Sequence, residues 1–227
     1  HTAQLFAEIL APPQAATIST PKAAPGKDQP RPNTKPLSVM LTNAIRQFVA
    51  KRGAGKTVIA GYPWFLDWGR DTFICARGLL SAGLHAEVAE ILRQFACFEE
   101  NGTLPNIIYG NDARNRDTSD APLWFIIAAA DACRLTNSAK ILDLKCGQRA
   151  LREVLESIAE NYRRGTPNGI KMDEQSGLIF SPPHFTWMDT NFPAGTPREG
   201  YPIEIQALWL TALIFLAQEG RHSKRWS

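Results

Sequence analysis

The sequence lacks the features that mark several classes of protein. It has no run of about eighteen apolar residues, the length that a membrane-spanning helix needs, and its first residues lack the charged-then-apolar order of a secretory signal peptide. Its 25 basic and 22 acidic residues are spread along the chain, so no basic stripe indicates nucleic acid or an anionic membrane as a partner. These absences make a cytoplasmic setting the default expectation, and a neutral substrate fits the charge well.

Metal, disulfide and nucleotide sites are also poorly represented. The four histidines show no ligand spacing, and the four cysteines form no C-x-x-C pair. Three of the cysteines lie in apolar helical patterns, which predicts buried, reduced thiols. Gly53-Ala54-Gly55-Lys56-Thr57 resembles the end of a phosphate-binding loop, but Ala50 stands where the first glycine is required and the residues that follow do not open a helix. We expect neither a metal nor a nucleotide.

What is present is enough for one domain with a sizeable core, since the chain has 227 residues of which 44% are hydrophobic. Residues 1–10 could form a short helix, but residues 11–36 are dense in proline, alanine and polar residues, which favours an extended linker. We therefore expect a tail and Pro-rich linker over residues 1–36 and the domain over residues 37–227. The chain opens with His1 rather than Met, as a piece of a longer parent would.

Six helical segments are expected in the domain, and they alternate between two kinds. The segments near residues 37–52, 84–100 and 141–164 are amphipathic, which predicts one exposed face each. The segments near 71–82, 119–135 and 203–218 are apolar nearly all round, which predicts burial on every side. The second and third amphipathic segments carry clear apolar stripes, made of Leu84, Val88, Ile91, Leu92 and Phe95, and of Leu151, Val154, Leu155, Ile158 and Tyr162.

An alternation of outer and inner helices predicts a barrel of helical hairpins, although a globular bundle could also mix the two kinds. Long connections lead into the inner helices, and helices that alternate in direction would bring these connections to one end. A mouth lined by Trp, Tyr, Arg, Asp and Glu suits a carbohydrate, because sugar faces stack on aromatic rings and hydroxyls bond to charged groups. The candidate substrate-binding residues there are Tyr62, Trp64, Trp68, Arg70, Asp71, Asn106, Asp120, Trp187, Arg198 and Glu204.

Several of these residues also have a purely structural interpretation. Asp71 and Asp120 stand at or beside helix N-termini, where aspartate is a common cap, and Glu204 falls in a first helical turn, where an acidic residue is favourable anyway. Arg198 could pair with a carboxylate or reach sugar hydroxyls. Three aromatic residues upstream of Asp71, around a small Gly69 that permits close approach, favour a sugar-binding wall there. For the segments around Asn106 and Asp120 both interpretations stay open.

Asp189 is the candidate catalytic acid. It ends the motif Thr186-Trp187-Met188-Asp189, in a stretch with too many turn formers to be helical. A tryptophan beside an aspartate offers an apolar wall, which favours the protonated carboxyl that a general acid needs near neutral pH. For Asp189 taken alone, a loop aspartate that bonds its own backbone is the better interpretation. The catalytic assignment therefore depends on a resemblance.

Taken in order, the motifs resemble the amylo-α-1,6-glucosidase domain of bacterial glycogen debranching enzymes, over about residues 61–215. Glucoamylases show a similar Trp-x-Arg-Asp wall before an inner helix. The matching stretches are Tyr62-Pro63-Trp64-Phe65, residues 68–74, Leu104-Pro105-Asn106, residues 119–124, Thr186-Trp187-Met188-Asp189, Thr196-Pro197-Arg198 and residues 204–209.

The resemblance implies an all-α fold, the (α/α)6 barrel of six-hairpin glycosidases, of which about half is present. It implies hydrolysis of the α-1,6-linked glucose at trimmed branch points of a glycogen-like glucan, with inversion and without a cofactor. Asp189 matches the general acid, and Trp68, Arg70 and Asp71 match the wall that holds the terminal glucose. The general base would lie beyond residue 227, and the rest of the barrel and an N-terminal domain would complete a longer parent, unless a half-barrel needs a partner.

Two other functions remain open at this point. One is a different (α/α)6 glycosidase, such as a glucoamylase or a trehalase. The other is a glucan-binding fragment without catalytic activity.

Overall fold

A computed structural model of the chain describes residues 36–191 and 193–219. The expected tail and linker lie outside this range, apart from Pro36. The described part is helix-rich, and none of its helices is long and apolar enough to cross a membrane. Its α-helices are α2 (Leu37–Arg46), α3 (Gly69–Ser81), α4 (His85–Ala96), α5 (Ala121–Thr136), α6 (Leu151–Arg164) and α7 (Ile203–Glu219), with a 3-10 helix η1 (Ala139–Asp143) after α5.

The strands are short and form four antiparallel pairs, which lie in the connections between helices. Three of these pairs are hairpins between neighbouring strands, whereas β3 pairs with β4 across the α3–α4 unit. The pairs are β1 (Val49–Arg52) with β2 (Gly55–Val58), β3 (Asp67–Trp68) with β4 (Ile107–Ile108), β5 (Lys145–Cys146) with β6 (Arg149–Ala150), and β7 (Lys171–Met172) with β8 (Ile179–Phe180).

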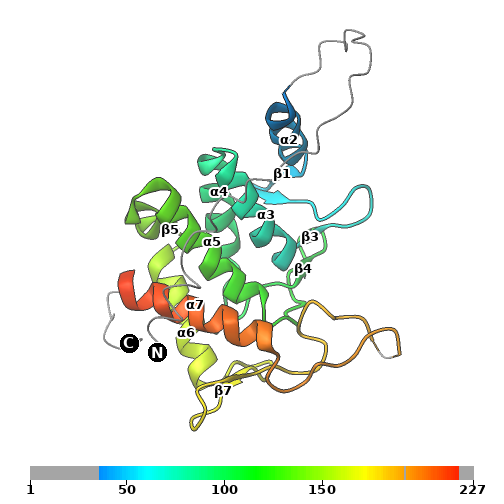
Figure 1. Cartoon of the computed structure of the whole chain (residues 1–227), viewed down its shortest axis with the longest axis vertical. Coiled ribbons are helices and arrows are strands. Elements are labelled where there is room, and N and C mark those ends of the chain that lie inside the picture. The colour runs from blue at the N-terminus through cyan, green and yellow to red at the C-terminus, as the bar shows by residue number, and fades with distance from the viewer. Residues whose placement is uncertain (1–35, 192, 220–227) are drawn as a thin grey trace, which may run out of the picture. The chain divides into compact units, whose positions relative to one another are not determined.

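Helix α5 is central to the packing, because it lies between α3 and α7 and contacts both (Figure 1). Ten of its residues are buried. Helix α4 packs against α3, α5 and α6, and α6 packs against α7. Phe73 of α3 makes edge-to-face contacts with Phe95 of α4 and Phe125 of α5, with ring centroids 4.9 and 5.2 Å apart. Thus α3, α5 and α7 form one row of helices, against which α4 and α6 pack.

The apolar stripes predicted for α4 and α6 are confirmed. Every residue of both stripes is buried, from Leu84 to Phe95 and from Leu151 to Tyr162. Both stripes repeat at three- and four-residue intervals, so one face of each helix meets the core. Strand β2 packs on α4 as well, and Lys56 of that strand lies near Glu87 and Glu90.

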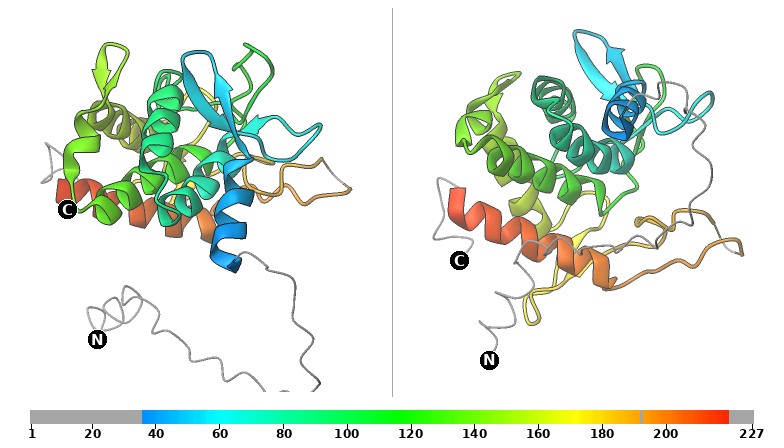
Figure 2. Two further views of the ribbon diagram at one scale, coloured as in Figure 1. Left: turned by 90° about the horizontal axis from the view of Figure 1, so that it is seen from above. Right: turned by 45° about the horizontal axis from the view of Figure 1, so that its top comes forward.

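The helix expected over residues 37–52 is wrong beyond Arg46. Residues 49–58 form the β1–β2 hairpin, which follows α2 in Figure 2 and packs against α4. Its two-residue turn places Gly53 at a φ of +54°, which glycine adopts without strain. A short apolar run with β-branched residues does not by itself separate strand from helix. The same hairpin contains residues 53–57, so this segment is not the strand-to-helix loop of a nucleotide site.

Two other amphipathic helices are shorter than expected. Helix α4 ends at Ala96, and residues 141–150 form the end of η1 and the β5–β6 hairpin before α6 begins. The turn of this hairpin contains Gly147 at a φ of +63°, which interrupts any helix there. Cys97 is exposed just after α4, contrary to the expectation of buried thiols, whereas Cys133 and Cys146 are buried; all four cysteines are free.

The prediction of burial on every side is also wrong for α3 and α7. Helix α3 is exposed along one face, at Asp71, Ile74, Arg77 and Ser81. Helix α7 has an open face of its own. Its inner side is buried against α5, α6 and β8. Its opposite side is open, since Ile203 is 78% exposed and Ala207, Leu210 and Thr211 are exposed on the same face. Among the described residues, no element covers this apolar face. The prediction failed because burial depends on which elements pack against a helix, and the apolar pattern of the helix does not fix them.

Candidate active site

Arg70 lies at the centre of the candidate site, in the first turn of α3. Its Nε donates to Asp120 Oδ2 at 2.5 Å and its Nη2 donates to the carbonyl oxygen of Thr186 at 2.8 Å. Its Nη1 lies 3.5 Å from Asp189 Oδ2. Burial lowers the pKa of Arg70, but the carboxylates, Asp120 first among them, raise it above its ordinary value. One guanidinium therefore joins the N-terminal ends of α3 and α5 to the loop that carries Asp189.

Asp120 precedes α5 directly, but its side chain does not cap the helix. Both carboxylate oxygens are used otherwise, one by Arg70 and the other by the hydroxyl of Thr118, which donates to Oδ1 at 2.8 Å. The Thr118 hydroxyl in turn accepts from the backbone N–H of Ala121 at 3.2 Å. The capping interpretation of the Asp120 side chain is therefore wrong, and Thr118 satisfies a backbone donor of the first turn instead.

Asp71 lies beside this cluster and is exposed. Its pKa is raised above that of an ordinary aspartate, mainly because the carboxyl is partly desolvated, and also because the charges of Asp189 and Asp120 are near. Arg70 acts in the opposite direction and lowers the pKa. Asp71 follows Arg70 in the first turn of α3, and Arg70 contacts Asp120 and Asp189, so the three carboxyl groups gather beside the N-terminal ends of α3 and α5.

Trp68 and Asn106 are held together by the pairing of β3 with β4. Trp68 is opposite Ile107, and the N–H of Gly69 donates to the Asn106 carbonyl at 2.9 Å. A Cβ on Gly69 would lie 2.7 Å from the carbonyl oxygen of Pro105, so the chain's own backbone closely approaches this glycine, while its part in a sugar-binding wall stays a prediction. The side-chain oxygen of Asn106 is buried without a hydrogen-bond partner.

Trp187, Arg198 and Glu204 form a second group. The Arg198 guanidinium carbon lies 5.7 Å from the centroid of the Trp187 ring, within the range of a cation–π contact. Arg198 Nη2 also donates to both carboxylate oxygens of Glu204, in the first turn of α7. The Trp187 side chain is 55% exposed. Arg198 thus pairs with a carboxylate, which was one of its two expected roles.

Hydrogen bonds connect the two sides of the loop that runs from His184 to Arg198. The N–H and the hydroxyl of Thr196 donate to the sulfur of Met188, at 3.2 and 3.1 Å. The N–H of His184 donates to the carbonyl of Pro197 at 2.7 Å. These contacts hold Asp189 in a loop whose two arms are bonded to each other.

Tyr62 and Trp64 are not brought into the cluster by any of these contacts. The Tyr62 hydroxyl donates to the carbonyl of Gln47 at 3.1 Å, and its ring centroid lies 6.2 Å from that of Phe48. Trp64 is 78% exposed on the same loop. Their expected part in the sugar-binding wall stays a prediction.

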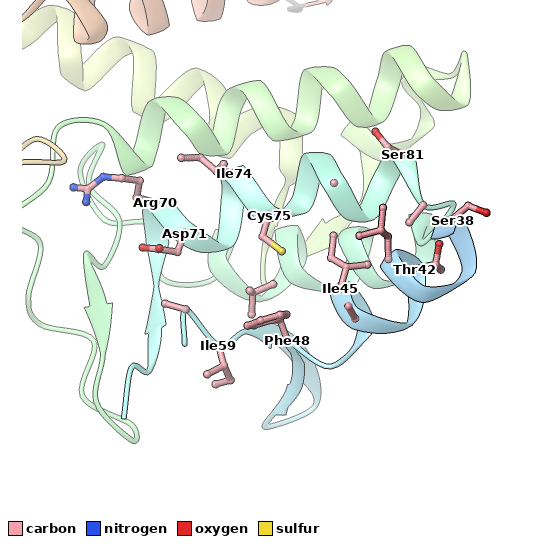
Figure 3. A pocket seen from close by; sticks show the side chains of 16 residues that line it. Ser38, Thr42, Ile45, Phe48, Ile59, Arg70, Asp71, Ile74, Cys75 and Ser81 are labelled. Carbon is pink, nitrogen blue, oxygen red and sulfur yellow. The ribbon is translucent and has the colours of Figure 1, made fainter. Parts of the chain in front are cut away.

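A cavity of about 780 Å³ lies between α2, β2 and α3. Figure 3 shows Arg70 and Asp71 at one end of it and Ser38 and Ser81 at the other, with Ile74 on its wall between them. Only the first end carries charged groups that could bind sugar hydroxyls. The rest of the cavity is an apolar groove along α3.

Sequence reasoning missed Thr118 and Thr186, which complete the contacts around Arg70. The position of Thr118 two residues before an Asp at a helix start is a signal that could have indicated capping. The Thr186 contact is made by a backbone carbonyl 116 residues from Arg70, for which no residue-type signal exists. Within the described residues, no group of three His, Cys, Asp or Glu side chains could hold a metal ion.

The family model of amylo-alpha-1,6-glucosidase matches this chain over residues 43–225. The chain belongs to the amylo-alpha-1,6-glucosidase family. It is also 26% identical, over 222 residues, to the glycogen debranching enzyme of Saccharomyces cerevisiae, in an alignment that covers 71% of this chain and 14% of the yeast protein. The chain thus spans a small part of the length of this relative. The family resemblance drawn from the motifs is confirmed.

Proposed function

We propose that this chain forms part of an inverting α-1,6-glucosidase site, which releases the glucose left at trimmed branch points of a glycogen-like glucan. The observation that carries this function is the convergence of Asp71, Asp120 and Asp189 on Arg70, in a chain of the amylo-alpha-1,6-glucosidase family. Carboxyl groups that share one site can divide acid and binding roles between them.

In the proposed mechanism, Asp189 donates a proton to the glycosidic oxygen while the bond from that oxygen to the anomeric carbon breaks. The oxygen leaves as a hydroxyl of the remaining glucan. Inversion needs a second carboxylate about 6.5–9.5 Å away, which activates a water molecule on the opposite face of the sugar. By family resemblance, we propose that this base comes from outside residues 1–227.

The other residues of the cluster divide between contact and positioning. Asp71 is exposed and can accept hydrogen bonds from sugar hydroxyls beside Trp68. Asp120 is buried with both oxygens bonded, so we propose that it positions Arg70 rather than contacting the sugar. Trp187 is exposed enough to stack on a glucose ring.

The arrangement of helices supports one half of an (α/α)6 barrel. In this interpretation α3, α5 and α7 are inner helices, and α2, α4 and α6 are outer ones. The two end members of the inner row both have open apolar positions, at Ile74 of α3 and at Ile203 and Leu210 of α7. Further inner helices of a closed ring would pack on these positions. We propose that the remainder of the barrel covers them.

The test is Asp189→Asn in a protein that contains this chain together with the rest of the barrel. Release of glucose from phosphorylase-limit dextrin should fall by about two to four orders of magnitude, the range for lost acid assistance, with glucan binding retained. Asp117→Asn, at an exposed loop position, is the matched control. Unchanged glucose release from the Asp189→Asn protein would disprove the assignment.

Two further measurements separate the alternatives. Faster hydrolysis of maltose than of limit dextrin would favour a glucoamylase-like enzyme, and glucan binding without hydrolysis by the barrel-containing protein would favour a binding module. The isolated 227-residue chain should release essentially no glucose. If it did so at a rate close to that of the longer protein, the base would lie within it, and Glu199 and Glu204 would be the first candidates.

A further inference from the structure

Two adjoining grooves flank the side chain of Tyr201, just before α7. One has a volume of about 560 Å³ and runs along the β7–β8 hairpin, where Phe180 and the hairpin turn line it. The other has a volume of about 330 Å³ and is lined by Arg198, Glu199 and Pro202. Tyr201 lines both grooves, so its ring stands where the two meet.

The aromatic floor of these grooves is held in place by backbone contacts. The rings of Phe180 and Tyr201 make an edge-to-face contact with centroids 6.0 Å apart. The residues next to them, Ser181 and Gly200, exchange two backbone hydrogen bonds of 2.7 and 3.0 Å. A surface built this way loses little conformational freedom when a ligand binds.

The hairpin itself is fastened to α7. The side-chain amide of Gln206 accepts from the N–H of Ile179 at 2.8 Å and donates to the Ile179 carbonyl at 2.9 Å. The Gln206 side chain therefore forms, with the outer edge of β8, the two hydrogen bonds that a neighbouring strand would form. The β7–β8 hairpin and the first turns of α7 are fixed as one unit.

The chemistry of the grooves fits an uncharged, hydroxyl-rich ligand. Tyr201 is 48% exposed, so it offers a partly open aromatic surface. Around it stand charges of both signs, with Lys171 and Arg198 against Asp173, Glu174 and Glu199. The two basic and three acidic groups nearly balance, so they attract charged ligands only weakly, but they supply donors and acceptors for hydroxyl groups.

The grooves also lead toward the candidate acid. Arg198 lines the groove of about 330 Å³ and at the same time covers the ring of Trp187. Trp187 stands two residues before Asp189 in the chain. Arg198 therefore connects the smaller groove with Trp187, in the loop that carries the candidate acid.

We propose that the two grooves around Tyr201 bind an α-glucan chain, namely the α-1,4-linked glucose units that remain with the leaving group after Asp189 has acted. This site rests on the proposed function for its place in the reaction, but its affinity for glucan is a separate property. Tyr201 stacks on one glucose ring, and the charged and amide side chains around it bond to the hydroxyl groups.

The experiment measures binding of maltoheptaose to the 227-residue chain by calorimetry. Tyr201→Ala should raise the Kd for maltoheptaose about tenfold, and Tyr201→Phe, which keeps the ring, should stay within about twofold of the wild type. Tyr109→Ala is the matched control, because Tyr109 is an exposed tyrosine outside both grooves. A Tyr201→Ala chain with the wild-type Kd would overturn the proposal.

A second measurement covers the case in which Tyr201→Ala disturbs folding. In the wild-type chain, addition of maltoheptaose should shift the backbone amide NMR signals of Lys171 and Gln175. Signals of both residues that stay unchanged at a saturating concentration of maltoheptaose would overturn the site. The two proposals fail separately. Normal glucose release by Asp189→Asn removes the proposed acid but leaves the Tyr201 result standing, and an unchanged Kd in Tyr201→Ala removes the groove but leaves the acid standing.

Discussion

The Nε atom of Arg70 lies 2.5 Å from Oδ2 of Asp120, so the first turn of α3 is tied to the residue that precedes α5. Both side chains are nearly buried, with 13% and 3% of their surfaces exposed. The same guanidinium reaches Thr186 and Asp189. Packing of the helix ends and placement of the candidate acid therefore depend on one side chain.

Arg70→Met should destabilise the chain by about 3–5 kcal/mol, because it leaves the buried carboxylate of Asp120 without its charged partner. Urea unfolding of the 227-residue chain measures this loss. Arg114→Met is the control, since Arg114 pairs with Asp112 at the surface. Loss of this exposed ion pair should not measurably change the free energy of unfolding. Equal stability of the two variants would show that the Arg70 contact is not a buried ion pair.

Gly69→Ala should destabilise the chain by about 1–3 kcal/mol, because a Cβ there meets the backbone oxygen of Pro105, which cannot move without disturbing the β3–β4 pair. Gly78→Ala in the same helix is the matched control. Its Cβ would meet only the flexible end of Ile45, and alanine favours the helix by about 1 kcal/mol. A lower unfolding temperature for Gly78→Ala than for Gly69→Ala would contradict the close approach at Gly69.

Asp71→Asn should gain stability relative to the wild type as the pH rises from 3 to 7. The pKa of Asp71 is raised in the folded chain, so the folded state binds the proton more tightly than the unfolded state. The wild type therefore loses stability as the pH rises from the unfolded pKa through the folded one, and asparagine does not. Denaturation at the two pH values measures the difference.

NMR titration of the carboxyl carbons provides the control for this pH effect. Asp112 should titrate at about 2, because hydrogen bonds with Arg114 lower its pKa, while Asp71 should titrate above an ordinary aspartate. The reverse order would refute the desolvation of the Asp71 carboxyl in the folded chain.

Gln206→Leu should destabilise the chain by about 1–3 kcal/mol, because it leaves the backbone N–H and C=O of Ile179 without partners. Amide exchange at Ile179 should become faster in this variant. Gln218→Leu, at an exposed position near the end of the same helix, should change neither quantity. Undiminished protection of Ile179 in Gln206→Leu would show that the side chain does not fasten the hairpin to α7.

The sequence by itself determined the positions of three apolar helices and the packing faces of α4 and α6. Helices α3, α5 and α7 begin and end within two residues of the predicted limits, because long apolar segments with helical spacing have few alternatives. Short segments were less predictable. The hairpin of residues 49–58 overlaps the end of one predicted helix, and that of residues 145–150 lies within another, since a pattern of a few residues fits strand and helix equally well.

The family and the candidate residues around Arg70 also followed from the sequence, since ordered motifs recur in related chains. Only the tertiary structure decided which of these residues meet. Arg70 pairs with Asp120, 50 residues away, and with Thr186, 116 residues away, while Tyr62 turns to Gln47 instead. The physical reason is that a polar contact depends on distances and angles of a few tenths of an ångström, which the packing of α3 against α5 sets and which spacing along the chain does not encode.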